Sequence, residues 1–114
     1  YDPGVAKYSE LPDGTFDCVF CTDVLEHIPE DELDEVLSVI FSKANKAVYL
    51  GICTVPADTI LPDGRNSHVT LHNLDWWCSV ISKFATIKTI VFCYGETKGT
   101  AILERNTIMF RKEK

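Results

Sequence analysis

Three ionisable side chains stand within five positions at the end of an apolar run. Residues 16–22 read FDCVFCT, and Asp23, Glu26 and His27 follow directly. Carboxylates bind ligand hydroxyls and metal ions, and an imidazole exchanges protons near neutral pH. A simple joint between a strand and a helix does not need so many ionisable groups. The stretch FDCVFCTDVLEHIP, residues 16–29, is therefore a candidate functional site.

The elements that must position this stretch alternate along the chain. Nearly continuous apolar runs predict buried strands, and apolar residues at helical spacing predict amphipathic helices. Asn45 is expected to end the first helix and Asn73 to cap the second. The expected strands are 16–22, 46–54, 86–94 and 100–111, and the expected helices are 30–43 and 74–85.

This order predicts an α/β fold in a single domain, residues 1–114, with a parallel sheet that ends in an antiparallel strand. Gly95 and Gly99 bracket the turn of the last hairpin. Ligands of open α/β sheets bind outside the carboxyl ends of the strands, which is where Asp23, Glu26 and His27 fall. The alternative is that Glu26 and His27 only begin a helix and face water.

Composition narrows the classes of function. The chain has 114 residues, 46% of them hydrophobic, and a net charge of −6, which disfavours nucleic acid and anionic membranes as partners. No apolar run reaches the roughly 18 residues of a membrane span. The five cysteines are an odd number in mostly apolar stretches, as expected of reduced thiols in a cytoplasmic protein.

A second group of polar and aromatic residues lies in and after the long loop 55–72. His68 or His72 is a candidate general base, and Trp76 is placed to stack on a flat substrate. Arg65 belongs to the same group and is a candidate substrate contact. The alternative is that these are ordinary surface histidines. Trp77 has the spacing of a core residue.

A zinc site is a further alternative, which the sequence disfavours. Cys18-x-x-Cys21 and His68-x-x-x-His72 have spacings found in zinc sites. However, both cysteines lie within a predicted strand, where an offset of three places side chains on opposite faces. We therefore expect no bound metal.

The stretch FDCVFCTDVLEHIP resembles the fourth motif of class I S-adenosylmethionine-dependent methyltransferases, which commonly reads FD-x-V-x-x-x-DVLEHI. The resemblance covers about Asp2 to Lys112 and is most specific at Asp17 and 23–27. It implies a partial Rossmann-like methyltransferase sheet of about four strands, two parallel strands plus a C-terminal β-hairpin, with two main helices. The residues it implies for the cofactor are Asp2, Thr22, Asp23, Val24 and Leu25.

The same resemblance implies that Glu26 and His27 face the methyl acceptor. It makes His27, His68 and His72 candidate catalytic residues, and Arg65 and Trp76 candidate acceptor contacts. The chain lacks two parts of the family's pattern. The family's glycine-rich loop, E/D-x-G-x-G-x-G, is absent, because none of the six glycines forms a GxG. The family's first strand, which lies beside the strand matched by 16–22, is absent too. The chain therefore resembles the second half of a methyltransferase, either as a fragment or as a reduced descendant.

Without that neighbour, strand 16–22 is expected at an open edge of the sheet. Such edges need a cover. The candidates are the segment 1–10, a second copy of the chain, or a missing N-terminal half, and we favour a homodimer. Two functions follow as expectations: methyl transfer from S-adenosylmethionine to a small-molecule acceptor, or a non-catalytic interaction module that uses its open edge.

Overall fold

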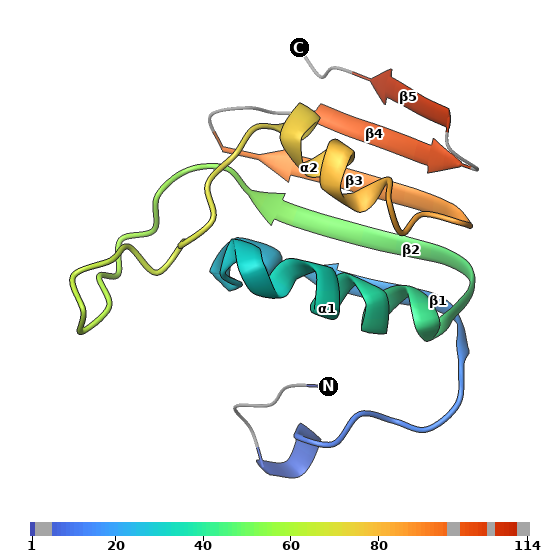
Figure 1. Cartoon of the computed structure of the whole chain (residues 1–114), viewed down its shortest axis with the longest axis horizontal. Coiled ribbons are helices and arrows are strands. Elements are labelled where there is room, and N and C mark those ends of the chain that lie inside the picture. The colour runs from blue at the N-terminus through green and yellow to red at the C-terminus, as the bar shows by residue number, and fades with distance from the viewer. Residues whose placement is uncertain (2–5, 96–98, 105–106, 112–114) are drawn as a thin grey trace.

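The computed structural model describes residues 1, 6–95, 99–104 and 107–111. It has a mixed five-stranded sheet and two α-helices, which confirms the α/β class (Figure 1). In chain order the elements are η1 (Ala6–Tyr8), β1 (Phe16–Thr22), η2 (Leu25–His27), α1 (Glu30–Ser42), β2 (Ala44–Cys53), α2 (Leu74–Ile81), β3 (Lys88–Tyr94), β4 (Gly99–Glu104) and β5 (Thr107–Arg111).

The strands lie side by side in the order of the sequence. β1, β2 and β3 are parallel, and β4 and β5 continue the sheet as antiparallel neighbours. The predicted hairpin between β3 and β4 is confirmed. The predicted single strand 100–111 is wrong, because the chain forms two strands there and Glu104 pairs with Thr107.

The helix boundaries follow local chemistry. α1 begins after Pro29 with three acidic residues in its first turn, which favours the positive end of the helix dipole. α2 begins at the predicted cap, because the Asn73 side chain accepts a hydrogen bond from the Trp76 backbone N–H at 2.9 Å. The prediction that Asn45 ends α1 is wrong: α1 ends at Ser42 and Asn45 already lies in β2.

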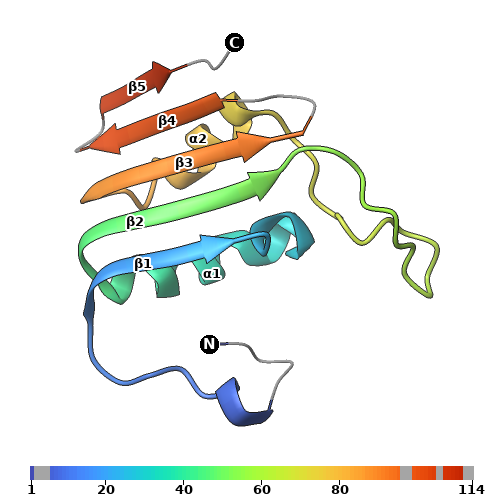
Figure 2. The same ribbon diagram turned by 180° about the vertical axis from the view of Figure 1, so that it is seen from behind.

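The core lies between one face of the sheet and both helices. α1 and α2 lie on the same face in Figure 1, and in Figure 2 the opposite face carries neither helix. Strand residues that point toward the helices are buried, as are the helix residues that meet them. The completely buried core residues include Leu37 of α1, Leu50 of β2, Trp77 of α2 and Val91 of β3.

The other face of the sheet is largely apolar, with Lys88 as an exposed charge, and has no helix over it in the part of the chain that the structure describes. One row across it contains Phe20, Tyr49, Ile90 and Ile102, which are register partners on successive strands. Phe20 is 70% exposed although its ring lies 5.8 Å from that of Tyr49. Parallel sheets are usually covered on both faces, so this surface is unusual.

β1 is the edge strand at one end of the sheet, as expected. Of the segment 1–10, which was one expected cover, residues 6–8 form η1, and the described residues do not pair with β1. In the described residues no helix is both long and apolar enough to cross a membrane.

Candidate functional site

The candidate site lies where β1, β2 and β3 reach their carboxyl ends. Because the three strands are parallel, Asp23, Cys53 and Tyr94 fall at the same edge of the sheet. η2 follows β1 there, and the segment 54–73 leaves β2 and extends away from the sheet before it returns to α2 (Figure 1). This arrangement brings together residues that are far apart in the sequence.

Asp23 occupies a turn that few residue types tolerate. Its φ angle of 58° is in the left-handed region, and its N–H donates to the Gly51 carbonyl at 2.9 Å. Tyr94, at the end of β3, donates its hydroxyl proton to the Asp23 carboxylate. Left-handed backbone costs a residue with a Cβ about 1–2 kcal/mol, and such strain concentrates at functional sites.

Glu26 is completely buried, so the prediction that its side chain faces an acceptor is not supported by its position. Its Oε2 accepts a hydrogen bond from the Cys53 backbone N–H at 2.7 Å. Its backbone carbonyl accepts from the Thr70 N–H at 3.1 Å. Among the described residues its Oε1 has no hydrogen-bond partner. Glu26 therefore joins η2 to the end of β2 and to the returning loop.

Two thiols lie close enough to Glu26 to be influenced by its charge. Burial raises the pKa of the Cys21 thiol to about 11, with the Glu26 carboxylate as a smaller cause. Burial also raises the pKa of Cys93 to about 12, with smaller effects of Cys78 and Glu26. Both thiols stay protonated near neutral pH and are poor nucleophiles.

The residues predicted to hold the cofactor separate into two groups. Thr22, Asp23 and Val24 are exposed at the tip of β1. Leu25 is fully buried in the core, so it lines no accessible surface and its predicted binding role is not supported. Asp2 lies outside the described residues.

His27 and His68 meet at this edge, although 41 positions separate them. Their ring centroids lie 4.7 Å apart with an interplanar angle of 78°. The Nδ1 of His27 is 2.8 Å from the Ser67 carbonyl oxygen, and the Nδ1 of His68 is 2.6 Å from that of Val55. A carbonyl oxygen only accepts hydrogen bonds, so each Nδ1 carries a proton and each neutral ring keeps its free lone pair on Nε2.

Asn66 fixes the loop that carries His68. Its side-chain oxygen accepts from the Ala57 and His68 backbone N–H groups, both at 2.9 Å. Its side-chain amide donates to the Ala57 carbonyl at 2.8 Å. The sequence pattern gave no sign of these partners.

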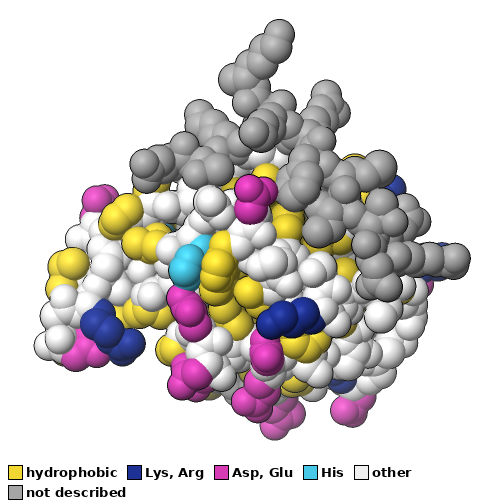
Figure 3. All heavy atoms as spheres, turned by 45° about the horizontal axis from the view of Figure 1, so that its top comes forward, with side chains coloured by type: hydrophobic (Ala, Val, Ile, Leu, Met, Phe, Trp, Pro, Cys, Tyr) yellow, Lys and Arg dark blue, Asp and Glu magenta, His cyan; other side chains and the backbone are white. Residues whose placement is uncertain are grey.

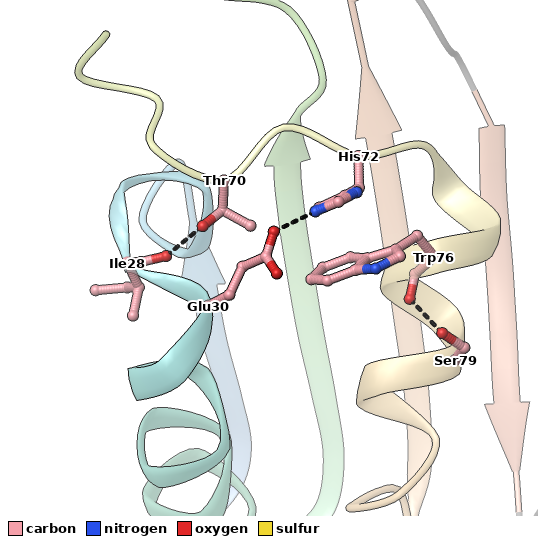
Figure 4. A network of polar contacts seen from close by, with 6 residues as sticks. All are labelled: Ile28, Glu30, Thr70, His72, Trp76 and Ser79. Atoms are coloured by element: carbon pink, nitrogen blue, oxygen red, sulfur yellow. Dashed lines mark hydrogen bonds and ion pairs between the residues drawn. The ribbon is translucent and has the colours of Figure 1, made fainter. Parts of the chain in front are cut away.

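His72 belongs to a different cluster (Figure 4). Its Nε2 contacts the Glu30 carboxylate, and its ring stacks on Trp76 with centroids 3.6 Å apart. The structure therefore does not bring His72 together with His27 and His68. One face of Trp76 is also occupied, which leaves less of this ring for the predicted substrate stacking.

The same figure shows how the returning loop is attached to the start of α1. The Thr70 hydroxyl donates to the Ile28 carbonyl at 2.6 Å, beside the contact between Glu30 and His72 (Figure 4). On α2, the Ser79 hydroxyl donates to the Trp76 carbonyl at 2.7 Å. Trp76 and His72 thus act as one packed unit between α1 and α2.

Arg65 lies in the projecting loop and contacts Asp63, with 2.7 Å between Nε and Oδ2. Hydrogen bonds from the Arg65 backbone and then its side chain hold the pKa of Asp63 below its usual range. Both side chains are exposed. The structure shows no contact between Arg65 and the two paired histidines.

The described residues contain no group of three or more His, Cys, Asp or Glu side chains arranged to hold a metal ion. Cys18 is exposed, Cys21 is half-buried, and all five cysteines are free. No protein-family model, curated protein or solved structure matched the chain. The site must therefore be interpreted from its own geometry.

Replacement of Asp23 tests whether its backbone is strained. We expect Asp23→Ala to lower the free energy of unfolding by about 1–2 kcal/mol, because alanine loses the contact with Tyr94 and tolerates a positive φ less well than aspartate. Asp23→Gly should be about 1 kcal/mol more stable than Asp23→Ala, since glycine adopts this φ freely. Urea unfolding of both variants measures the difference. Equal losses would show that the contact with Tyr94, rather than the backbone, sets the cost.

Proposed function

We propose that this chain is the acceptor-side part of a partial Rossmann-like, S-adenosylmethionine-dependent methyltransferase that acts on a small molecule. The observation that carries the proposal is the arrangement at the carboxyl edge. The motif residue Asp23 takes a strained, exposed position there, and His27 meets His68 beside it. Polar groups at the carboxyl edge of parallel strands are typical of ligand sites in this class of sheet.

The residues at the edge fit part of the cofactor. The Asp23 carboxylate accepts hydrogen bonds from an amino or hydroxyl group, and Thr22 and Val24 are exposed next to it. Leu25 does not contribute because it belongs to the core. No GxG loop occurs in the chain, so the contacts that the family's glycine-rich loop makes are missing, and we propose that the ligand binds through the residues at the end of β1.

The paired imidazoles support the acceptor half of the reaction. When bound, S-adenosylmethionine supplies an electrophilic methyl group on a positively charged sulfur. A hydroxyl or amine acceptor must lose a proton as it gains that methyl group. The Nε2 lone pair of His27 or His68 is free to accept this proton, because Nδ1 of each ring donates to a carbonyl.

Charge supports a small acceptor over a nucleic acid. The chain carries 17 acidic and 11 basic residues. Figure 3 shows acidic side chains spread over the visible face, with only isolated basic side chains among the described residues. A polyanion needs clustered Lys and Arg side chains. The five free cysteines are in keeping with a reducing, cytoplasmic location.

Calorimetric titration with S-adenosylhomocysteine tests the proposal. We expect a Kd tighter than ~100 μM, about −5.5 kcal/mol, and at least a tenfold loss of affinity in Asp23→Ala. Asp34→Ala, on the exposed side of α1, is the matched control and should bind as the original chain does. A chain that gives no heat with ~1 mM ligand would contradict a working cofactor site.

The uncovered sheet face favours a second candidate function, a non-catalytic interaction module whose partner is a second copy. Five strands about 4.8 Å apart, each about seven residues of 3.3 Å, make a face of roughly 550 Å². Two such faces together bury about 1,100 Å², near the minimum for a specific interface. The row from Phe20 to Ile102 on this face is uncharged, so copies meet there without charge repulsion.

Sedimentation velocity across micromolar concentrations measures this association. We expect a dimer, and we expect Phe20→Lys to make the chain monomeric, because a charge on the face is costly to bury. Ile60→Lys is the matched control, since Ile60 is 58% exposed but belongs to the segment 54–73 between β2 and α2 and not to the sheet. A monomer at all concentrations, or a dimer that survives Phe20→Lys, would rule out this interface.

A further inference from the structure

We propose that His27 and His68 together bind one late transition-metal ion through their Nε2 atoms and leave its other positions open. The inference goes beyond methyl transfer and does not require it, because a ring whose Nε2 binds a metal ion cannot accept a proton there at the same time. It rests on three observations: the carbonyl partners of the two Nδ1 atoms, the distance between the rings, and the attachment of each ring to the fold.

The proton positions make both rings available as ligands. Each Nδ1 donates to a backbone carbonyl, at 2.8 Å for His27 and 2.6 Å for His68. Histidines that bind metals usually make this contact with their second nitrogen, because it fixes the ring and raises the basicity of the ligating atom. With Nδ1 donating to a carbonyl, the ring-nitrogen lone pair of each neutral imidazole lies on Nε2.

The ring separation matches two ligands of one ion. A metal–nitrogen bond of 2.0–2.1 Å places the ion about 3.2 Å from the centre of each imidazole. With both Nε2 atoms directed at one ion, the lines from the ion to the two ring centres, which lie 4.7 Å apart, form an angle at the ion. This angle is roughly 95°, near that of adjacent ligands in square-planar or octahedral coordination. The separation is therefore compatible with one ion shared by the two rings, and imidazole ligands suit late transition metals such as Ni²⁺, Cu²⁺ and Zn²⁺.

Both rings are held before any ion arrives. His27 ends η2, where its backbone N–H donates to the Val24 carbonyl at 2.9 Å. His68 is held by its own backbone N–H, which donates to the Asn66 side chain at 2.9 Å. Ligands fixed in this way lose little conformational freedom on binding, which favours affinity.

Two protein ligands define an open site. The described residues supply no third His, Cys, Asp or Glu ligand, so this is not the closed four-ligand arrangement of structural zinc. Water, or an oxygen or nitrogen of a small molecule, would occupy the remaining positions. For imidazole ligands the affinity should be highest for Cu²⁺ and lower for Ni²⁺ and Zn²⁺.

Calorimetric titration with NiCl₂ and CuCl₂ tests the site. We expect one ion per chain, with Cu²⁺ bound more tightly than Ni²⁺. His27→Ala and His68→Ala should each weaken binding at least tenfold. The chain contains three histidines, so His72→Ala completes the set as a matched control and should bind normally. S-adenosylhomocysteine is titrated separately without metal, so failure of one proposal is distinct from failure of the other.

Three results would overturn the proposal: no saturable binding at millimolar metal, loss in only one of the two variants, or an equal loss in His72→Ala. A second measurement uses the unaltered chain, so the proposal can be tested even where the variants fail to fold. In the unaltered chain, added Zn²⁺ should shift the NMR signals of the His27 and His68 rings and leave those of His72 in place. Shifts at all three rings, or at none, would contradict a paired site.

Discussion

A buried carboxylate determines how the carboxyl-terminal ends of the parallel strands are joined to the segments that follow them. Glu26 has no exposed surface, and its Oε2 accepts the Cys53 N–H while its carbonyl accepts the Thr70 N–H. A buried backbone N–H without a partner is costly, so the side chain at position 26 must provide an acceptor. His27 follows Glu26 directly and Asp23 lies three positions before it, so both candidate site residues stand next to this attachment.

The main features of the fold could be predicted because they depend on local patterns. The apolar period of α1, the Asn73 cap and the apolar runs of β1, β2 and β3 act over a few neighbouring residues. β5 was missed because the sequence between the two last strands, Arg105-Asn106, contains neither glycine nor proline. The end of α1 was misplaced because the chain passes from Ser42 to Ala44 with almost no loop.

The site was predicted in outline only. The edge position of Asp23 follows from the end of the strand, but the inward turn of Leu25 and Glu26 comes from the short helix η2, in which His27 remains exposed. In a short 3₁₀ turn, neighbouring side chains point in different directions. The motif sequence does not show which of them point into the core. Contacts between distant segments, such as Tyr94 with Asp23, have no local signal. The position of Tyr94 at the end of β3 was the available clue.

The direct test of the central claim, that the Glu26 carboxylate organises this edge, is the free energy of unfolding of two variants in urea. Glu26→Ala removes the acceptor and leaves a cavity, so it should lose about 3 kcal/mol or more. Glu26→Gln keeps an acceptor for the Cys53 N–H and should lose at least 1 kcal/mol less than the alanine variant. Equal losses in the two variants, or an alanine variant as stable as the original chain, would contradict the account.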